Sequence, residues 1–170
     1  MPDTGLVLRP ATDSDAGTLR DIAWRSWATA YGPFVPEDDR RVFFDEFYGH
    51  EGHRRAVRSE RSLFLVAEDR GAPVAFVLAA HARGRVHLHR LYADPGRWRH
   101  GAGQALWDAL VAWSRRRGAE RIEFEVATEG DSGPRFYRKQ GCTPVRETVM
   151  PVGGTPVRVT VYEYRLTAPS

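Results

Sequence analysis

A basic loop followed by two close glycines could hold a phosphate group. Residues 91–106 read LYADPGRWRHGAGQAL, so a strand-like end is followed by Arg97, Arg99 and His100 and then by Gly101–Gly103. Glycines let backbone N–H groups converge, and the start of a helix adds unpaired donors and a partial positive charge. Such a loop suits an anion such as a pyrophosphate. The alternative is a tight turn from strand to helix without a ligand.

Two familiar phosphate motifs do not fit this loop. The third glycine of the dinucleotide-binding fingerprint is missing, and no Lys-Ser or Lys-Thr follows as in a Walker loop. The strands expected before the loop form an antiparallel meander, whereas a dinucleotide fold starts with a βαβ unit.

Length and composition predict one globular domain over residues 1–170. Hydrophobic residues make up 42% and aromatic residues 11% of the chain, which is enough for a packed core. No run reaches about 18 apolar residues, so we expect no membrane span. The first residues lack the pattern of a signal peptide, which favours a cytoplasmic protein. A single cysteine, Cys142, argues against a disulfide framework and a CxxC metal site, and we expect no metal.

The basic balance does not indicate nucleic-acid binding. The formal net charge is +3, with 25 Lys and Arg residues scattered among 22 Asp and Glu residues. The densest run, Arg115–Arg117, falls at the expected end of a helix, where cations are favourable. We therefore expect no nucleic-acid partner.

Hydrophobic periodicity and turn residues predict an α+β fold. Strands are expected at residues 6–9, 62–67, 73–82, 85–93, 121–127, 145–150 and 157–166. A capping box at 12–15 starts a helix to about 30, and further helices are expected at 38–48, 101–118 and 133–140, with a partly helical stretch at 50–58. In the second helix we expect Val42, Phe43 and Phe47 on the apolar face. This order predicts three layers around a mixed, mostly antiparallel sheet of about seven strands, in which 85–93 and 121–127 are parallel.

The chain resembles the GNAT superfamily of acetyl-CoA-dependent N-acetyltransferases. The core motif of that family is a strand ending in Leu-Tyr-Val and a proline, followed by a glycine loop that opens a helix. Its counterpart here is Leu91-Tyr92-Ala93, Pro95 and residues 98–103, and Phe136-Tyr137 with Gly141 resembles the second motif. The resemblance covers nearly the whole chain in the same element order.

The resemblance implies a binding site for acetyl-CoA between the two parallel strands, which splay apart in this family. Backbone groups of Leu91 and Ala93 would pair with the pantetheine arm, and residues 99–104 would hold the pyrophosphate. The backbone N–H near Leu91 would also polarise the thioester carbonyl. The expected cofactor-binding residues are Leu91, Tyr92, Ala93, Arg97, Trp98, Arg99, His100, Gly101, Ala102, Gly103, Gln104, Asp131 and Tyr137.

Three positions depart from the family pattern. Trp98 replaces a usual Arg or Gln in the loop, where backbone donors do most of the phosphate binding. Cys142 replaces a usual Phe and is expected to pack as a small hydrophobic residue. Asp131 is the nearest polar substitute for a missing Asn, and an acid beside an anionic ligand is unexpected.

The resemblance also assigns the groups that move protons. His87 stands where the family often has a Glu that serves as the base, and His89 points to the same side of the strand. Tyr137 occupies the position of the general acid that protonates the leaving thiolate. The alternatives are two polar histidines on a solvent-facing sheet and a core tyrosine.

The acceptor pocket should lie beside the first helix and the loop after it. Trp27, Tyr31 and Phe34 are candidate walls, although each could be a core residue. Glu125 could attract a cationic amine or could be an exposed strand acid. The sequence thus predicts acetyl transfer to a primary amine of a small molecule or peptide, by direct attack in a ternary complex. A non-catalytic acyl-CoA-binding module is the alternative, and a homodimer through the C-terminal hairpin is possible.

Overall fold

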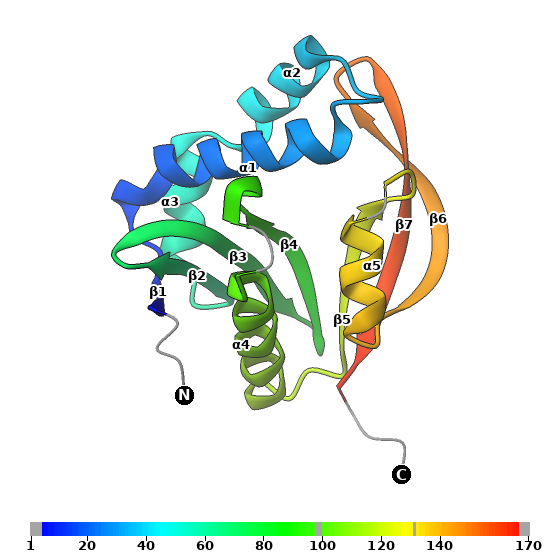
Figure 1. The fold of residues 1–170 in the computed structure, drawn as a ribbon. Helices are drawn as coiled ribbons and strands as arrows, with labels where there is room; N and C mark the ends of the chain where they lie inside the picture. Colours follow the sequence, from blue (N-terminus) through cyan, green and yellow to red (C-terminus); the bar gives the residue numbers. More distant parts are fainter. Residues whose placement is uncertain (1–4, 98–99, 131, 167–170) are drawn as a thin grey trace.

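A computed structural model describes residues 5–97, 100–130 and 132–166 (Figure 1). The strands are β1 (Leu6–Pro10), β2 (Ser62–Asp69), β3 (Ala72–Ala82), β4 (Arg85–Ala93), β5 (Arg121–Ala127), β6 (Thr143–Val152) and β7 (Thr155–Arg165). The helices are α1 (Ala16–Tyr31), α2 (Glu37–Phe47), α3 (His50–Arg58), α4 (Ala102–Arg116) and α5 (Ser132–Lys139), with 3-10 turns at Asp13–Asp15 and Pro95–Arg97. No helix in the described part of the chain is long and apolar enough to cross a membrane.

The described strands form one mixed sheet in the order β1-β2-β3-β4-β5-β7-β6. Neighbouring strands are antiparallel except for β4 and β5, which are joined by the crossover helix α4 and run parallel. A strand–helix–strand unit of this kind gives parallel neighbours because the chain must return to the same end of the sheet. The predicted α+β class and the predicted parallel pair are confirmed.

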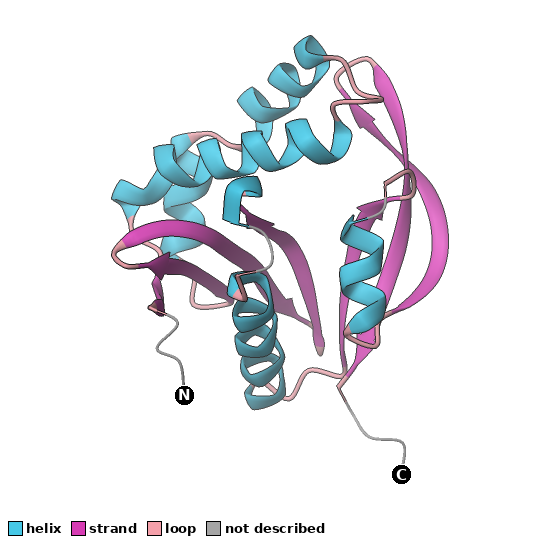
Figure 2. Ribbon diagram, in the orientation of Figure 1, coloured by secondary structure: helices cyan, strands magenta, loops and turns pink. Residues whose placement is uncertain are grey.

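Each face of the sheet carries its own hydrophobic core (Figure 2). On one face α4 and α5 pack against the sheet through residues such as Leu106, Trp107 and Tyr137. On the other face α1 and α2 bury Ile22, Trp27 and Phe44 with side chains of β2 and β3. The strands in the middle of the sheet are therefore covered on both sides, which gives the predicted three layers.

The buried face of α2 differs from the predicted one. Val42 and Phe47 are 56% and 49% exposed, whereas Phe44 is fully buried and Arg40 is 9% exposed. Phe44 meets the ring of Trp24 on α1 edge-on at 5.1 Å. Of the three predicted residues, Phe43 packs against the core, but Val42 and Phe47 lie outside it, because Phe44 occupies the side of α2 that faces Trp24.

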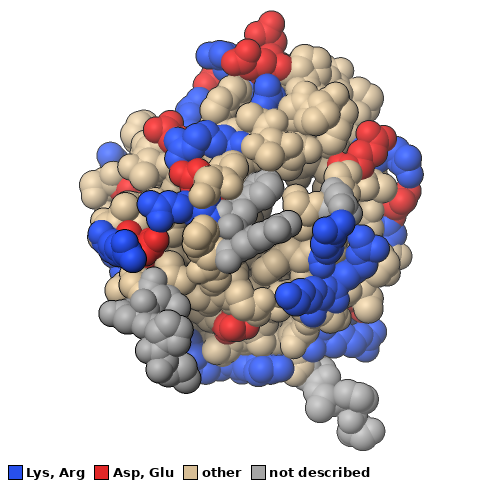
Figure 3. All heavy atoms as spheres, in the orientation of Figure 1, with Lys and Arg blue, Asp and Glu red and all other residues tan. Residues whose placement is uncertain are grey.

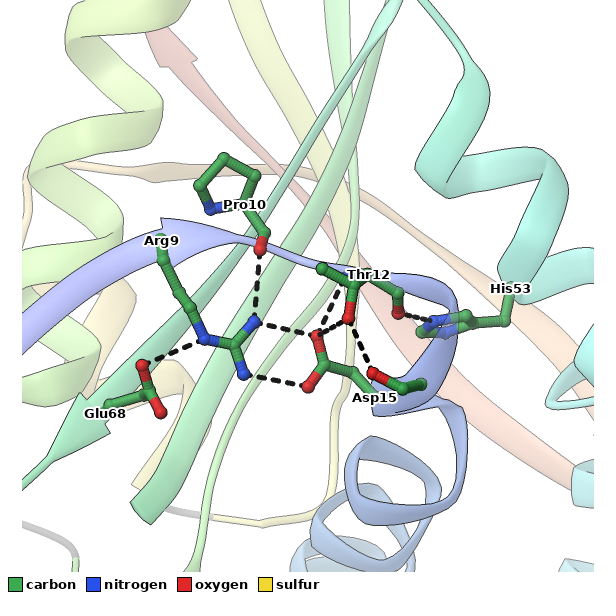
Figure 4. A network of polar contacts seen from close by, with 7 residues as sticks. Arg9, Pro10, Thr12, Asp15, His53 and Glu68 are labelled. Atoms are coloured by element: carbon green, nitrogen blue, oxygen red, sulfur yellow. Dashed lines mark hydrogen bonds and ion pairs between the residues drawn. The ribbon is translucent and has the colours of Figure 1, made fainter. Parts of the chain in front are cut away.

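A polar network fixes the first strand to the start of the first helix (Figure 4). Arg9 donates from both terminal nitrogens to the carboxylate of Asp15 at 2.8 Å and from Nε to Glu68 at 2.9 Å. The backbone N–H of Thr12 donates to Asp15 at 2.7 Å, which completes the predicted capping box. His53 of α3 donates from Nε2 to the carbonyl of Thr12 at 2.8 Å, so the 50–58 stretch is a full helix anchored to this network.

Candidate active site

The parallel strands β4 and β5 separate soon after they meet. Within the described strands their register runs over Arg85↔Arg121, Val86↔Ile122 and His87↔Glu123, although β4 continues to Ala93 and β5 to Ala127. Figure 1 shows the two strands diverging beyond this point. A separation of this kind opens a strand edge, to which an extended molecule can add by main-chain hydrogen bonds.

A β-bulge in β4 accounts for the divergence. Ala79 of β3 pairs with Leu88, but the next residue, Leu78, pairs with Arg90, so His89 is an extra residue in β4. A bulge bends its strand and increases the local twist. The bend begins just after the last β4–β5 pair, and it leads the second half of β4 away from β5.

A histidine and a glutamate face each other at the point of separation. His87 Nε2 lies 3.0 Å from Glu125 Oε2, and this hydrogen bond joins β4 to β5. Because a carboxylate can only accept, Nε2 carries the proton, which leaves Nδ1 free to accept another when the ring is neutral. The rings of His87 and His89 are stacked 4.6 Å apart at an angle of 4°. The structure thus brings together three of the predicted site residues.

The surroundings shift the pKa values of these groups in opposite directions. The hydrogen bond to Glu125 raises the pKa of His87 above its ordinary value, and it lowers the pKa of Glu125. Burial, aided by the charges of His87 and Arg90, lowers the pKa of His89 to about 4. At neutral pH His89 is therefore uncharged, whereas the raised pKa of His87 favours its protonated form.

Tyr137 of α5 lies in the core on the α4 side of the sheet. Its ring packs on Phe124 at 4.3 Å and on Trp107 at 5.9 Å, and the residue is 9% exposed. Burial raises the pKa of its phenol far above the ordinary value, and the nearby phenols of Tyr92 and Tyr31 add to this shift. The hydroxyl therefore keeps its proton throughout the neutral range, where it has a proton that it could donate.

The glycine loop has the geometry of an anion site. Gly101 has φ +87°, a left-handed conformation that favours glycine, and it is the N-cap of α4. Among the described residues no side chain caps this helix, so the N–H groups of Ala102, Gly103 and Gln104 fall in a first turn without internal acceptors. The donors and the helix dipole suit a pyrophosphate. Trp98, Arg99 and Asp131, also expected to bind the cofactor, lie outside the described residues.

The other expected cofactor-binding residues lie in different surroundings. Leu91 and Ala93 pack toward α4, whereas Tyr92 packs in the core beneath α1. His100 is exposed beside Gly101. Arg97 donates to Asp69 at 2.8 Å, so its charge is already paired with an acid. The side chain of Gln104 bonds to Gln140, which ties α4 to the segment after α5.

Basic residues gather beside the loop on α5, which the sequence reasoning did not single out. Figure 3 shows Lys and Arg atoms grouped on the part of the surface where α5 lies. Arg138 and Lys139 form the last turn of this helix. The sequence carries a signal for this group, because two cations directly follow the Phe-Tyr pair. Their charge favours an anionic ligand nearby.

Of the expected pocket walls, Trp27 is a core residue, and Tyr31 and Phe34 are partly buried against that core. Trp27 is 3% exposed, and its indole N–H donates to the hydroxyl of Tyr92 at 2.9 Å. Tyr31 is tilted against Trp27 at 4.4 Å, and the backbone of Ala127 on β5 hydrogen-bonds its hydroxyl. Phe34 packs edge-on against Tyr31 at 5.8 Å. The contact with Ala127 places the Tyr31 hydroxyl at the C-terminal end of β5.

A hollow of about 340 Å³ lies nearby, where α2 and α3 cover the strands β3 and β4. Its lining includes Phe43, Phe47, Tyr48, Leu78, His89 and Arg90. The guanidinium of Arg90 lies 3.8 Å from the centre of the Tyr48 ring and donates to the carbonyl of Phe47 at 2.6 Å. The sequence analysis did not assign Phe47 or Arg90 to a site, because it considered Phe47 only as part of one face of a helix and did not foresee the bulge beside Arg90.

A polar contact links α2 to the turn between β6 and β7. Asp39 accepts from the backbone N–H of Gly154 at 2.9 Å and from the hydroxyl of Thr155. Gly153 has φ +57°, and a Cβ there would lie 2.6 Å from Asp39 Oδ1, so only glycine allows this approach. The contact therefore keeps the β6–β7 turn next to α2 (Figure 1).

Comparisons with known proteins agree on the fold. Residues 18–142 match the model of the acetyltransferase (GNAT) family. The structure resembles PaiA N-acetyltransferase from Thermoplasma acidophilum in complex with coenzyme A, with a TM-score of 0.79 and 21% identity over 94% of this chain and 98% of that one. It also resembles the ribosomal-protein-S18-alanine N-acetyltransferase from Escherichia coli, with a TM-score of 0.74 and 16% identity over 97% and 96% of the two chains.

A curated relative matches only part of the chain. An uncharacterized N-acetyltransferase from Methanocaldococcus jannaschii is 28% identical over 92 residues, which are 50% of this chain and 41% of that protein. The chain therefore matches less than half the length of this relative.

Proposed function

The chain belongs to the acetyltransferase (GNAT) family, and from that premise we propose that it moves the acetyl group of acetyl-CoA to a primary amine of a small molecule or peptide. The amine attacks the thioester directly while both substrates are bound. The observation that carries this proposal is the separation of β4 from β5 just beyond the His87–Glu125 contact, beside the uncapped start of α4.

Acetyl-CoA would be held by backbone groups on both sides of the α4 start. The N–H groups at Ala102, Gly103 and Gln104 would receive the pyrophosphate, and the cations of α5 would add attraction. The pantetheine arm would lie along β4 near Leu91 and Ala93 in the manner of an added strand. A backbone N–H near Leu91 would polarise the thioester carbonyl.

His87 would remove the proton that prevents the amine from attacking. A free amine has a pKa of about 10.4 and is almost wholly protonated at neutral pH. Glu125 fixes the imidazole so that Nε2 carries the proton and Nδ1 accepts the one from the amine, directly or through a water. Glu125 also stabilises the imidazolium that results.

Tyr137 would return a proton as the carbon–sulfur bond breaks. A free thiol has a pKa of about 8.5, so the departing sulfur needs a donor. The buried phenol of Tyr137 stays protonated at neutral pH and comes from the helix beside the open end of β5. The ring is also a core residue, so both roles belong to one side chain.

An acceptor screen read by release of the CoA thiol tests this function. Thiol release that requires an amine, with an acetylated amine detected by mass spectrometry, supports the proposal. Tyr137→Phe keeps the ring and should lower turnover by a factor on the order of 10² to 10⁴ with unchanged acetyl-CoA affinity. Binding of acetyl-CoA without transfer to any amine would instead identify a non-catalytic acyl-CoA-binding module.

A further inference from the structure

The ring of His89 separates the hollow beside Arg90 from His87, the proposed base. His89 lines this hollow, and its ring is stacked on that of His87 at 4.6 Å. A molecule seated there therefore has its nearest end close to His87 and Glu125. The volume of about 340 Å³ falls at the low end of the range for small-ligand sites, which suits one ring rather than a long chain.

The walls of the hollow are aromatic, and one of them is exposed. Phe43 and Phe47 pack together at 4.6 Å, and Tyr48 lies next to them in the chain. Phe47 remains 49% exposed, although an aromatic side chain is usually covered. A ligand ring packed here would cover Phe47 and gain an aromatic contact.

The charge around the hollow selects against a second cation. Arg90 lines it, and none of the described residues that form its lining is acidic. His89 is neutral at neutral pH and supplies no negative charge. An ammonium group placed beside Arg90 would be repelled, whereas the reacting amine itself would lie toward Glu125.

We propose that the acceptor is an arylalkylamine, a primary amine with one aromatic ring and no second cationic group, whose ring lies in the hollow against Phe47. This inference rests on the proposed function, since it names the substrate of that same site. A diamine would carry a second cation to Arg90, and a short aliphatic amine would leave the aromatic walls uncovered.

The test compares kcat/KM for phenethylamine, n-propylamine and putrescine at saturating acetyl-CoA. We expect phenethylamine to exceed n-propylamine by about tenfold or more and putrescine to be the poorest. Phe47→Ala should lower kcat/KM about three- to tenfold for phenethylamine and leave n-propylamine unchanged. Val42→Ala on the same helix removes a similarly exposed apolar side chain outside the hollow and should change neither.

Equal values for phenethylamine and n-propylamine, or an equal loss for both in Phe47→Ala, would overturn the inference while the proposed function stands. If no amine is acetylated, the proposed function fails, and calorimetry with phenethylamine and the CoA-loaded protein decides the inference separately. Binding that weakens in Phe47→Ala but not in Val42→Ala supports the hollow as a site for the ring. Absence of binding, or binding equal in both variants, contradicts it.

Discussion

Among the contacts between a basic side chain and a carboxylate that join separate elements, Arg9–Asp15 and His87–Glu125 differ in their surroundings. In the first, Arg9 and Asp15 are 29% and 9% exposed, and further hydrogen bonds from Thr12 and to Glu68 occupy the remaining polar atoms. In the second, the side chains of His87 and Glu125 are 44% and 38% exposed, and Nδ1 of the neutral histidine can still accept a proton. A saturated pair serves the fold, whereas an accessible pair at a strand separation is suited to chemistry.

The two contacts also respond to opposite changes of pH. The hydrogen bond from Arg9 lowers the pKa of Asp15 to about 2, from an ordinary value of 3.8. Its stabilising effect is therefore complete above the ordinary value and is lost as the pH falls toward 2. The pKa of His87 is raised, so its smaller, solvent-screened contribution is present at low pH and is lost as the pH rises through that raised value.

Replacing His87 should give the largest effect, on rate alone. His87→Gln can still hydrogen-bond to Glu125 but cannot take up a proton, so turnover at neutral pH should fall by a factor on the order of 10² to 10⁴. The loss should be partly recovered at high pH as free amine accumulates. Turnover and thermal unfolding are measured together, and the melting temperature should stay near that of the wild type. An unchanged rate would remove His87 from the mechanism, and His89 would be the next candidate.

Replacing Asp15 should give the reverse result, an effect on stability alone. Asp15→Asn keeps the shape of the side chain but removes the charge that pairs with Arg9, which should cost about 2 kcal/mol of unfolding free energy at neutral pH. Urea unfolding at pH 7 and at pH 3 measures it, and the difference from the wild type should shrink at the lower pH. A variant with wild-type stability and reduced kcat would show that the Arg9–Asp15 contact serves catalysis and not the fold.

Replacing Glu125 should give the smallest effect, a displacement of the pH–rate profile. The rate should rise with pH as His87 loses its proton, and Glu125 places that rise above the ordinary imidazole pKa of 6.5. Glu125→Gln retains a hydrogen-bond acceptor without the charge that raises the pKa of His87, so the rise should move to lower pH. Profiles of kcat/KM for both proteins make the comparison, with Glu129→Gln as a control for loss of one surface charge. An unmoved rise would mean that Glu125 does not control His87.

Much of the fold could be predicted from local patterns. The alternation in the strands, the capping box at Thr12 and the glycines at the turns are short-range signals that tertiary packing did not override. The apolar face of α2 could not be predicted in this way. That face depends on how Phe44 fits Trp24, and a count of apolar residues along one helix does not contain this partner.

The candidate site likewise combines features that local sequence patterns predict with features that depend on tertiary contacts. The glycine loop and the positions of His87 and Tyr137 follow from motifs contiguous in the sequence. The contact of His87 with Glu125 joins residues 38 positions apart, and the hollow at Arg90 depends on a bulge that no residue type announces. The sequence therefore indicates the proposed catalytic groups more directly than the surface that would select the amine.

Calorimetric titration of acetyl-CoA into two glycine variants tests the proposed site most directly. Gly101→Asp places a carboxylate and a strained backbone at the start of α4, and Gly118→Asp places the same residue just beyond its end, also at positive φ and with open space around it. We predict that Gly101→Asp abolishes binding, because the carboxylate repels the pyrophosphate, while Gly118→Asp binds as the wild type does. Wild-type affinity in a folded Gly101→Asp protein would contradict the assignment of this loop to acetyl-CoA.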